Sequence, residues 1–571
     1  MRSRLRTRPA LLVALLVLAA GWAALSATRS TPRTLDRATA VHAVLANPRA
    51  ARQLARGERW TRVQVGAVDA TTTRVTFFDG PRIVAQAALR PNGSLERFLD
   101  FRQLRVSYGV PLTQRPLFLL VAALAFVLAT AVVPLRRLRN LDVLALLALV
   151  APVVLLDDRF AEASTLAALP SLLWLTGRCG WRALRPSAPP AALARPLLDV
   201  LTPAWDDTQR VRLLRLAVGV AAACTVMITV SAQTTVDVAQ AVMEGGTLLV
   251  HGTLPYGHMP GDVFHGDVYP LLSYAVYAPL ALVMPVHDAW DVANGALIVA
   301  ALAAVAGAWL LARLGRAVAA RADGTSADAG ELTAKAAGLR AALAWLTLPP
   351  LLVTVSTGTN DVLLGVLVLA ALALVRRPLA STASLLTAAW FKVVPFVLLP
   401  IWLARLRGRR LAAALGLIAA SAALTLLALV ALGGTGAPRA MLHAVAYQVQ
   451  RRTLHSPWEL LHVGSLQPLG QAAVLALVAG ATVRVRRDPA LAGDPVRLAA
   501  LAGAVLLGLQ LAGNYWTYLY LAWVVPCALI GLLADAPETV RASVAARALN
   551  PARRNADRRT DAVPAGTPLP S

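Results

Sequence analysis

Apolar runs long enough to cross a lipid bilayer recur along most of the chain. Residues 411–432 contain no charged side chain, and neither do residues 295–312. A bilayer core about 30 Å thick requires roughly 20 apolar residues in a helix, so each run predicts a membrane span. The mean hydropathy of +0.61 exceeds what a soluble domain needs to fill its core. We therefore predict an all-α polytopic membrane protein.

The formal net charge of +25 comes mostly from arginines in short clusters between the apolar runs. Cytoplasmic loops of membrane proteins are marked by such clusters. We interpret the charge as a signal of topology and expect membrane lipids, not nucleic acid, as partners. The three cysteines lie in or beside apolar segments without a pairing pattern, which favours neither a disulfide framework nor a zinc site.

Arginine placement gives a topology of about 14 spans with a small α+β extracytoplasmic domain near the N-terminus. In that domain a helix-like start around 39–55 precedes the strand-like runs TRVQVGAVD, TRVTFFDG and RIVAQAAL, which are separated by turn residues, and no catalytic pattern is apparent. The run 268–286 is assigned to a juxtamembrane or re-entrant helix, because a full span there would place Arg313, Arg316 and Arg321 outside. The predicted regions are an N-terminal membrane anchor (1–29), the extracytoplasmic α+β domain (30–112), membrane spans with a basic cytoplasmic loop (113–211), a transmembrane catalytic core (212–534) and a disordered basic cytoplasmic tail (535–571).

The segment 233–291 is polar and rich in histidine, although apolar runs flank it. It holds six carboxylates and four of the eight histidines of the chain. Many ionisable groups in one outer loop between two spans indicate chemistry at that loop. Asp237 follows a predicted membrane exit and has apolar neighbours, so it is a candidate general base. It could equally cap the start of a helix, since VAQAVM follows it.

Lys392 is one of two lysines, against 53 arginines, and no other charge follows it until Arg405. A buried ammonium group requires an anionic partner, for which a phosphate is a natural candidate; a lysine that snorkels to the interface is the alternative. A second outer loop, 433–466, carries Arg451, Arg452 and His455, which suit a phosphate but could also contact lipid headgroups.

His251, His258 and His265 recur every seven residues, near Asp262 and Asp267. This spacing matches no established ligand set, so we expect hydrogen bonding to a substrate and no cofactor, with a divalent metal as the alternative. Aromatic side chains in both outer loops could stack on sugar rings or form an interfacial belt. Together these features predict substrate contacts from Tyr256, His258, Asp262, His265, Asp267, Tyr269, Asn360 and Tyr515.

Several segments, in order and on the predicted outer side, resemble the glycosyltransferase-C superfamily. They are VDVAQAVMEGGTLLVHGTLPYG, YPLLSYAVYAPL, TGTNDVLLGVLVLAAL, WFKVVPFVLLP, the HSPWELL loop and NYWTYLYLAW, within residues 212–534. The pattern is similar to the actinobacterial polyprenyl-phosphate-mannose-dependent mannosyltransferases (glycosyltransferase family 87, domain of unknown function 2029). Where that family usually has an aromatic pair after its Asp, this chain has Val238 and Gln240. The N-terminal 200 residues have no counterpart in the simplest members.

The resemblance implies inverting transfer of a sugar, such as mannose, from a polyprenyl-phosphate donor to an envelope lipid or glycan. The reaction would take place at the extracytoplasmic face of the cell membrane. The resemblance implies Asp237 as the catalytic base and Lys392 as a donor-phosphate ligand. The competing interpretation is a transporter or flippase for lipid-linked sugars, or a non-catalytic scaffold. A transporter would need polar groups at mid-membrane depth or inverted repeats.

Overall fold

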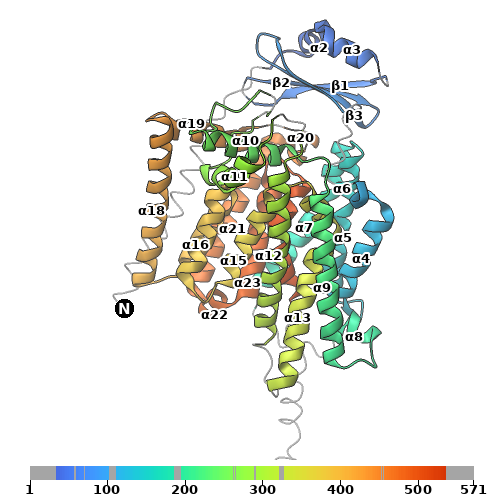
Figure 1. The fold of residues 1–571 in the computed structure, drawn as a ribbon, viewed down its shortest axis with the longest axis vertical. Helices are drawn as coiled ribbons and strands as arrows, with labels where there is room; N and C mark the ends of the chain where they lie inside the picture. Colours follow the sequence, from blue (N-terminus) through green and yellow to red (C-terminus); the bar gives the residue numbers. More distant parts are fainter. Residues whose placement is uncertain are drawn as a thin grey trace, which may run out of the picture.

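The described part of the protein is a helical bundle with a small sheet lying across one end (Figure 1). The computed structural model describes residues 34–56, 59–69, 71–101, 111–185, 195–261, 263, 265–287, 291–320, 327–451, 453 and 455–534. The predicted anchor (1–29) and tail (535–571) lie outside these residues. What is described is mostly helical and apolar, as expected of a multi-pass membrane protein.

The sheet is four-stranded and antiparallel, with the strands in sequence order: β1 (Arg62–Ala67), β2 (Thr73–Asp79), β3 (Arg82–Leu89) and β4 (Leu95–Asp100). Val75 of β2 lies opposite Val65 on one side and Ala87 on the other. Val75 and Phe77 point to the same face, because side chains alternate along a strand, and they pack with Val44 in a small core. Val44 belongs to helix α2 (Arg37–Ala46), which covers this face with α3 (Pro48–Ala55).

Three strands lie where alternation predicted them, and two details of this domain differ. β4 was not predicted, because LERFLD is short and mixes charged and apolar residues without a regular period. The helical segment expected around 39–55 is two helices. Asn47 accepts hydrogen bonds from the N–H groups of Arg49 and Ala50, and Pro48 occupies the first helical position. Proline cannot continue the preceding helix, so a new one begins there.

Six helices among the described residues are long and apolar enough to cross a membrane. A seventh candidate is the pair 330–347 and Pro349–Ser356, bent by 59°. Five shorter apolar helices accompany them. The count of about 14 is therefore supported only in its coarser form, a multi-pass protein. The six are Leu138–Asp157, Asp207–Val230 (α9), Asn294–Ala319 (α12), Gly408–Gly433 (α18), Gly464–Arg487 and Pro495–Ala512 (α23).

Two of the shorter helices, α10 (Asp237–Val250) and α11 (Leu271–Val283), lie together at the sheet-facing end (Figure 1). Their approach depends on Gly245, where a Cβ atom would stand 2.1 Å from Cδ1 of Tyr274. At 1.5 Å per residue, the 13 residues of α11 extend about 20 Å, less than the thickness of a bilayer core. α11 occupies the run that was assigned to a juxtamembrane helix.

The sheet is attached to the bundle next to the start of α7 (Ala161–Leu184). The Ile83 N–H donates a hydrogen bond to the Arg159 carbonyl (3.1 Å), and Arg62 pairs with Glu162 at 3.1 Å. Phe78 and Ile83 pack against Ala161. These contacts fix the sheet over the end of the bundle where α10 and α11 lie.

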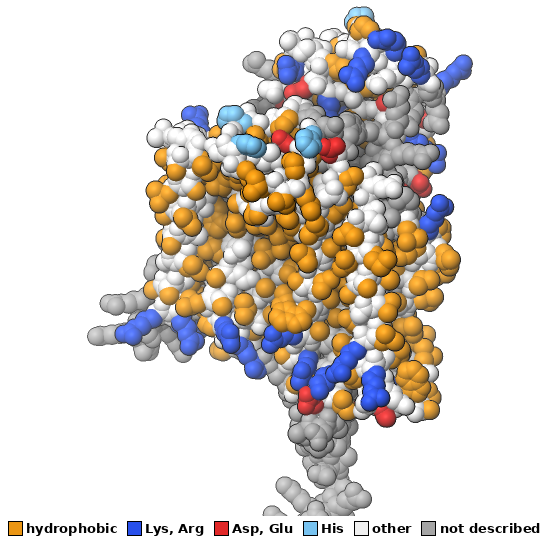
Figure 2. All heavy atoms as spheres, in the orientation of Figure 1, with side chains coloured by type: hydrophobic (Ala, Val, Ile, Leu, Met, Phe, Trp, Pro, Cys, Tyr) orange, Lys and Arg blue, Asp and Glu red, His pale blue; other side chains and the backbone are white. Residues whose placement is uncertain are grey.

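Side chains of different kinds separate along the bundle (Figure 2). On the face drawn, apolar side chains cover the flank of the bundle, and histidine and acidic side chains gather just below the sheet. Arginines form a band at the opposite end. This distribution agrees with the arginine pattern expected of a cytoplasmic side opposite the sheet.

Candidate functional site

Asp237 is the first residue of α10, at the end of the bundle that faces the sheet. The chain is held there by backbone contacts, because the Val236 N–H donates to the Thr357 carbonyl at 3.1 Å. Gly358 follows with φ +74°, and a Cβ there would approach Ala239 at 3.4 Å. The Asp237 carboxylate accepts a hydrogen bond from the Val238 N–H at 2.9 Å, and the side chain remains exposed. An accessible carboxylate thus stands beside the TGTND turn.

The TGTND turn also supplies the partner of Lys392. Lys392 Nζ contacts Asp361 Oδ1 at 2.6 Å and Asn360 Oδ1 at 3.4 Å, with both charged side chains almost fully buried. Asp361 begins helix α15 (Asp361–Ala373), and Lys392 directly follows helix α16 (Pro378–Phe391). The expected anionic partner of Lys392 is therefore present inside the protein. Asn360 Nδ2 is buried without a hydrogen-bond partner in the described part of the chain, so one donor is still open.

Two tyrosine rings enclose the ammonium group of Lys392. Tyr269 lies with its ring centre 5.5 Å from Nζ, and Tyr520 at 5.3 Å. Both distances allow cation–π attraction, which strengthens where water is excluded. Burial raises the pKa of Tyr269 well above its usual value, and the carboxylates of Asp237 and Asp361 raise it further. Tyr269 is therefore within electrostatic range of both the exposed and the ion-paired carboxylate and remains a neutral phenol.

Arg451 brings a second cation to the same cluster from the C-terminal end of helix α19 (Ala437–Gln450). Its Nη2 donates to the Tyr520 hydroxyl at 3.0 Å, and the guanidinium lies 3.7 Å from the ring centre of Tyr515. The backbone carbonyl of Arg451 accepts a hydrogen bond from the Asn514 side chain. Arg451 Nε is buried and lacks a hydrogen-bond partner among the described residues. Tyr520 and Tyr515 thus fix the orientation of the guanidinium, and its Nε–H can still donate a hydrogen bond to a ligand.

The sheet domain contributes charged side chains to this cluster. Asp69, in the turn after β1, lies 3.6 Å from Nε2 of His265. The His265 ring stacks on Tyr447 of α19, with ring centres 3.8 Å apart. Burial lowers the pKa of His265, and the arginines Arg451 and Arg97 act in the same direction, whereas Asp69 and Asp267 oppose it. His265 therefore links the outer loop to the sheet as a neutral ring at pH 7.

Arg74 of β2 is a second contribution from the sheet. Burial lowers the pKa of its guanidinium to about 10, and it lies within electrostatic range of Tyr447 and Glu459. His455 is affected by both Arg74 and Arg451: burial and these two cations lower its pKa to about 4. His455 also contacts the edge of Tyr515, with ring centres 5.3 Å apart. Two arginines from separate regions of the chain thus flank one neutral histidine.

Other predicted site residues hold the shape of the outer loop. The hydroxyl of buried Tyr256 donates to the Tyr269 carbonyl at 3.0 Å, and Asp267 accepts from the Gly257 N–H at 3.2 Å. These bonds fix Tyr269 in place. His258 is exposed, and His251 bonds to the Thr247 carbonyl at 2.8 Å. The three regularly spaced histidines thus face different surroundings.

Within the described ranges, no group of three or more His, Cys, Asp or Glu side chains is placed to hold a metal ion. Two predicted site residues, Asp262 and Arg452, lie outside those ranges. The structure brings most of the others to one end of the bundle: Asp237, Tyr269, Asn360, Lys392, Arg451, His455, His265 and Tyr515. Their roles remain predictions.

Four members of the cluster were not anticipated: Asp361, Tyr520, Asp69 and Arg74. Asp361 and Tyr520 stand in segments already singled out, TGTND and NYWTYLY, so attention to every polar residue of those segments would have found them. Asp69 and Arg74 belong to a domain in which no catalytic pattern was apparent. Their position depends on how the sheet docks, which sequence spacing does not encode.

No protein-family model, curated protein or solved structure matches the chain.

Proposed function

We propose that this protein is an integral-membrane glycosyltransferase that uses a polyprenyl-phosphate-linked sugar as donor. The acceptor would be an envelope lipid or glycan, and transfer would take place with inversion at the extracytoplasmic face. The proposal combines the resemblance of its motifs to the mannosyltransferases of the glycosyltransferase-C superfamily with the cluster of side chains below the sheet. The observation that carries it is the exposed Asp237 beside a cluster of buried and half-buried cations and tyrosines.

The two carboxylates of the cluster suit different tasks. A general base must reach the proton that it removes, and Asp237 is exposed whereas Asp361 is buried and ion-paired with Lys392. We therefore assign the base to Asp237. Asp361 would fix Lys392 and keep the charge of the buried ammonium balanced.

The proposed reaction is a single displacement at the anomeric carbon of the donor sugar. The acceptor oxygen bonds to that carbon and gives its proton to Asp237. The bond between the anomeric carbon and the phosphate oxygen breaks, and its electron pair leaves with the polyprenyl phosphate. Arg451 and Lys392 would stabilise the departing phosphate, because charge-assisted donors are strongest where water is excluded. No nucleotide takes part, since the donor already carries an activated linkage.

The rings and amide that line the cluster suit a sugar. Tyr269, Tyr515 and Tyr520 offer apolar faces with hydroxyl groups at their edges. Asn360 Nδ2 offers a buried donor that has no hydrogen-bond partner among the described residues. A sugar ring can stack on the aromatic faces and accept a hydrogen bond from the amide through a hydroxyl oxygen. A molecule without such an oxygen would leave the buried Asn360 donor unpaired and would bind more weakly.

Asp237→Asn tests the proposal directly. The amide keeps the size of the side chain but cannot accept the proton, so we expect transfer to fall ~10²–10⁴-fold. Transfer is measured with purified full-length protein in proteoliposomes, radiolabelled polyprenyl-phosphate mannose and an envelope lipid extract as acceptor. The matched control is Asp207→Asn, the same change at the first residue of another helix, α9.

Normal transfer by Asp237→Asn would rule out this base. If the wild-type protein transfers no sugar to any extracted lipid or glycan but moves the labelled donor between leaflets, the transporter interpretation replaces the enzyme. If it does neither, the scaffold interpretation applies.

A further inference from the structure

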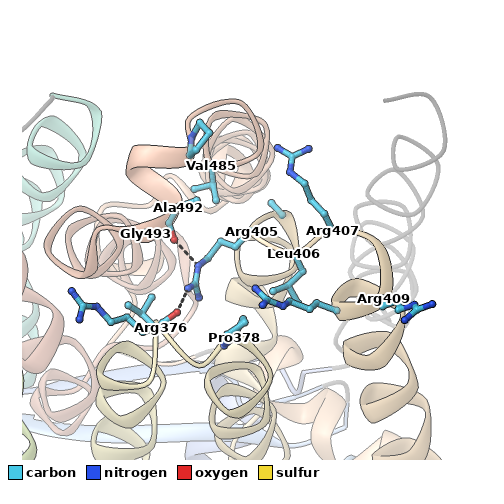
Figure 3. Close-up of a pocket in the computed structure, with 13 residues that line it drawn as sticks. Arg376, Pro378, Arg405, Leu406, Arg407, Arg409, Val485, Ala492 and Gly493 are labelled. Atoms are coloured by element: carbon cyan, nitrogen blue, oxygen red, sulfur yellow. Dashed lines mark hydrogen bonds between the residues drawn. The ribbon is translucent and has the colours of Figure 1, made fainter. Parts of the chain in front are cut away.

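A concave site lies at the end of the bundle opposite the sheet, where helix α22 (Pro489–Gly493) is labelled in Figure 1. Its cavity has a volume of about 640 Å³ and is formed by the ends of several helices (Figure 3). Five of the lining side chains are arginines and none is acidic: Arg376, Arg405, Arg407, Arg409 and Arg410. The cavity is therefore a concentrated positive site.

Neighbouring arginines at the same end have acidic partners. Arg484 and Arg497 both contact Asp488 at 3.3 Å, and Arg316 contacts Glu331 at 3.0 Å. The five arginines of the cavity have no such partner among the residues that line it. Like charges around a small volume repel one another, and an anion within it would relieve that repulsion.

Arg405 is held in a direction that leaves a donor for such an anion. Its Nε donates to the Ala492 carbonyl at 2.8 Å and its Nη2 to the Val375 carbonyl at 2.5 Å, as the dashed lines in Figure 3 mark. Its Nη1 is buried and has no hydrogen-bond partner in the described structure. The planar guanidinium is thus fixed by two backbone carbonyls, one in α22 and one in the turn that follows α15, and the remaining donor is pre-organised for an oxyanion.

We propose that this cavity binds the phosphate group of an anionic phospholipid in the cytoplasmic leaflet. Arginine matches the geometry of phosphate oxygens through paired N–H donors. Apolar side chains continue the site towards the bilayer, because Leu379 and Leu415 lie close in sequence to lining residues and are 41% and 39% exposed. A headgroup in the cavity would place its acyl chains along this apolar surface. The site is separate from the Asp237 cluster and does not rest on the proposed function.

The alternative is that the arginines only orient the chain in the membrane, as the positive-inside rule requires. In that case any pair of arginines at this end would have the same effect on lipid binding. The chain offers a matched comparison: Arg409 and Arg410 begin α18, and Arg212 and Arg215 lie in the first turns of α9. All four side chains are exposed, so neither double change removes a buried contact.

The experiment is native mass spectrometry of the purified full-length protein in detergent with phosphatidylglycerol or phosphatidylcholine added. We expect phosphatidylglycerol to be retained at least tenfold more than phosphatidylcholine. Arg409→Gln/Arg410→Gln should reduce that retention at least threefold, and Arg212→Gln/Arg215→Gln should leave it unchanged. Equal losses in both double variants, or equal retention of both lipids, would overturn the proposal.

Two further arms complete the test. Arg405→Gln should lower retention more than the exposed pair does, provided that its thermal unfolding temperature matches the wild type; unchanged retention in a folded Arg405→Gln protein would contradict the assigned donor. Inorganic phosphate at millimolar concentration is added in the second arm. Lipid retention that resists phosphate supports the lipid headgroup, whereas complete displacement of lipid by phosphate would overturn the lipid as occupant in favour of a soluble phosphate.

Discussion

The two ends of the helical bundle hold their charges in opposite ways. Below the sheet, Lys392 meets Asp361, Arg451 meets the Tyr520 hydroxyl and the Tyr515 ring, and His265 meets Asp69. At the other end, five arginines surround a cavity that no acidic residue lines. Partners at the first end come from segments far apart in sequence, whereas the arginines at the second end come from helix termini.

The difference separates two reasons for placing charge in a membrane protein. Charge that only sets orientation needs no specific partner and tolerates any position at the interface. Buried charge must be compensated, because its desolvation is expensive unless an opposite charge or several hydrogen bonds are supplied. The sheet-facing end therefore carries a specified arrangement, and the following changes test how specific it is.

The two lysines of the chain provide the largest contrast. Lys392→Met leaves the buried Asp361 without its partner, which should lower the free energy of unfolding by about 3–5 kcal/mol. Lys335→Met is the matched control: Lys335 pairs at 2.8 Å with Glu331, an exposed residue one helical turn away, and solvent-exposed pairs of this kind contribute little to stability. Denaturant unfolding in micelles, followed by tryptophan fluorescence, measures both values.

A second variant keeps this prediction interpretable. Lys392→Met/Asp361→Leu removes both charges and should recover most of the lost stability, because an apolar pair of similar volume avoids desolvation. Equal, small losses for both lysine variants would indicate that Lys392 is an interfacial lysine. The sheet-facing end would then lack a buried ion pair that contributes measurably to stability.

Arg74 tests whether the sheet belongs to the site. Arg74→Gln should raise the KM for the donor about tenfold, equivalent to about 1.4 kcal/mol, because a half-buried cation within electrostatic range of Tyr447 is removed. Arg90→Gln in the same sheet is the control, since its side chain is 62% exposed and its contact with Glu96 is 3.8 Å. If the KM for the donor is the same in Arg74→Gln, Arg90→Gln and wild type, the sheet domain does not contribute to the site.

The smallest expected effect is a dependence on pH. Burial lowers the pKa of His265 below 6.5 and that of His455 to about 4, so the folded protein binds fewer protons than the unfolded chain between these values. Stability is therefore complete above pH 6.5 and decreases as the pH falls towards 4. The thermal unfolding temperature at pH 7.5 and 5.5 should differ by less in His265→Gln than in wild type.

His42→Gln is the control for that comparison, because His42 is exposed on α2 of the sheet domain. It should keep the full difference between the two pH values. A difference that is as large in His265→Gln as in His42→Gln would show that His265 does not sense the pH.

Much of the fold could be predicted from local patterns. Apolar length located the long helices that are candidates to cross a membrane, and alternation located three of the four strands, because both signals are contained in a short window. Helix breaks were less accessible: the bend of 59° between 347 and 349 occurs within one apolar run, and the Pro349–Pro350 pair indicates a break without giving its angle. Whether such a segment counts as one span or two depends on packing.

The site could be predicted in part. Lys392 was identified because it is an isolated charge in an apolar segment. A buried ammonium group in such a segment requires an anionic partner. The partner, Asp361, lies 31 residues away and could not be identified from spacing, since the contact depends on how α15 and α16 pack. Arg74 was beyond reach for a similar reason: it is an ordinary strand arginine until the sheet docks over the bundle.

The sheet is tethered on two sides, by Arg62 and Ile83 at the start of α7 and by Asp69 at the outer loop. Two separate attachments hold the sheet domain against rotation about either one. The positions of His265 and of the Tyr447 ring stacked on it are therefore set by the sheet domain as well as by the bundle.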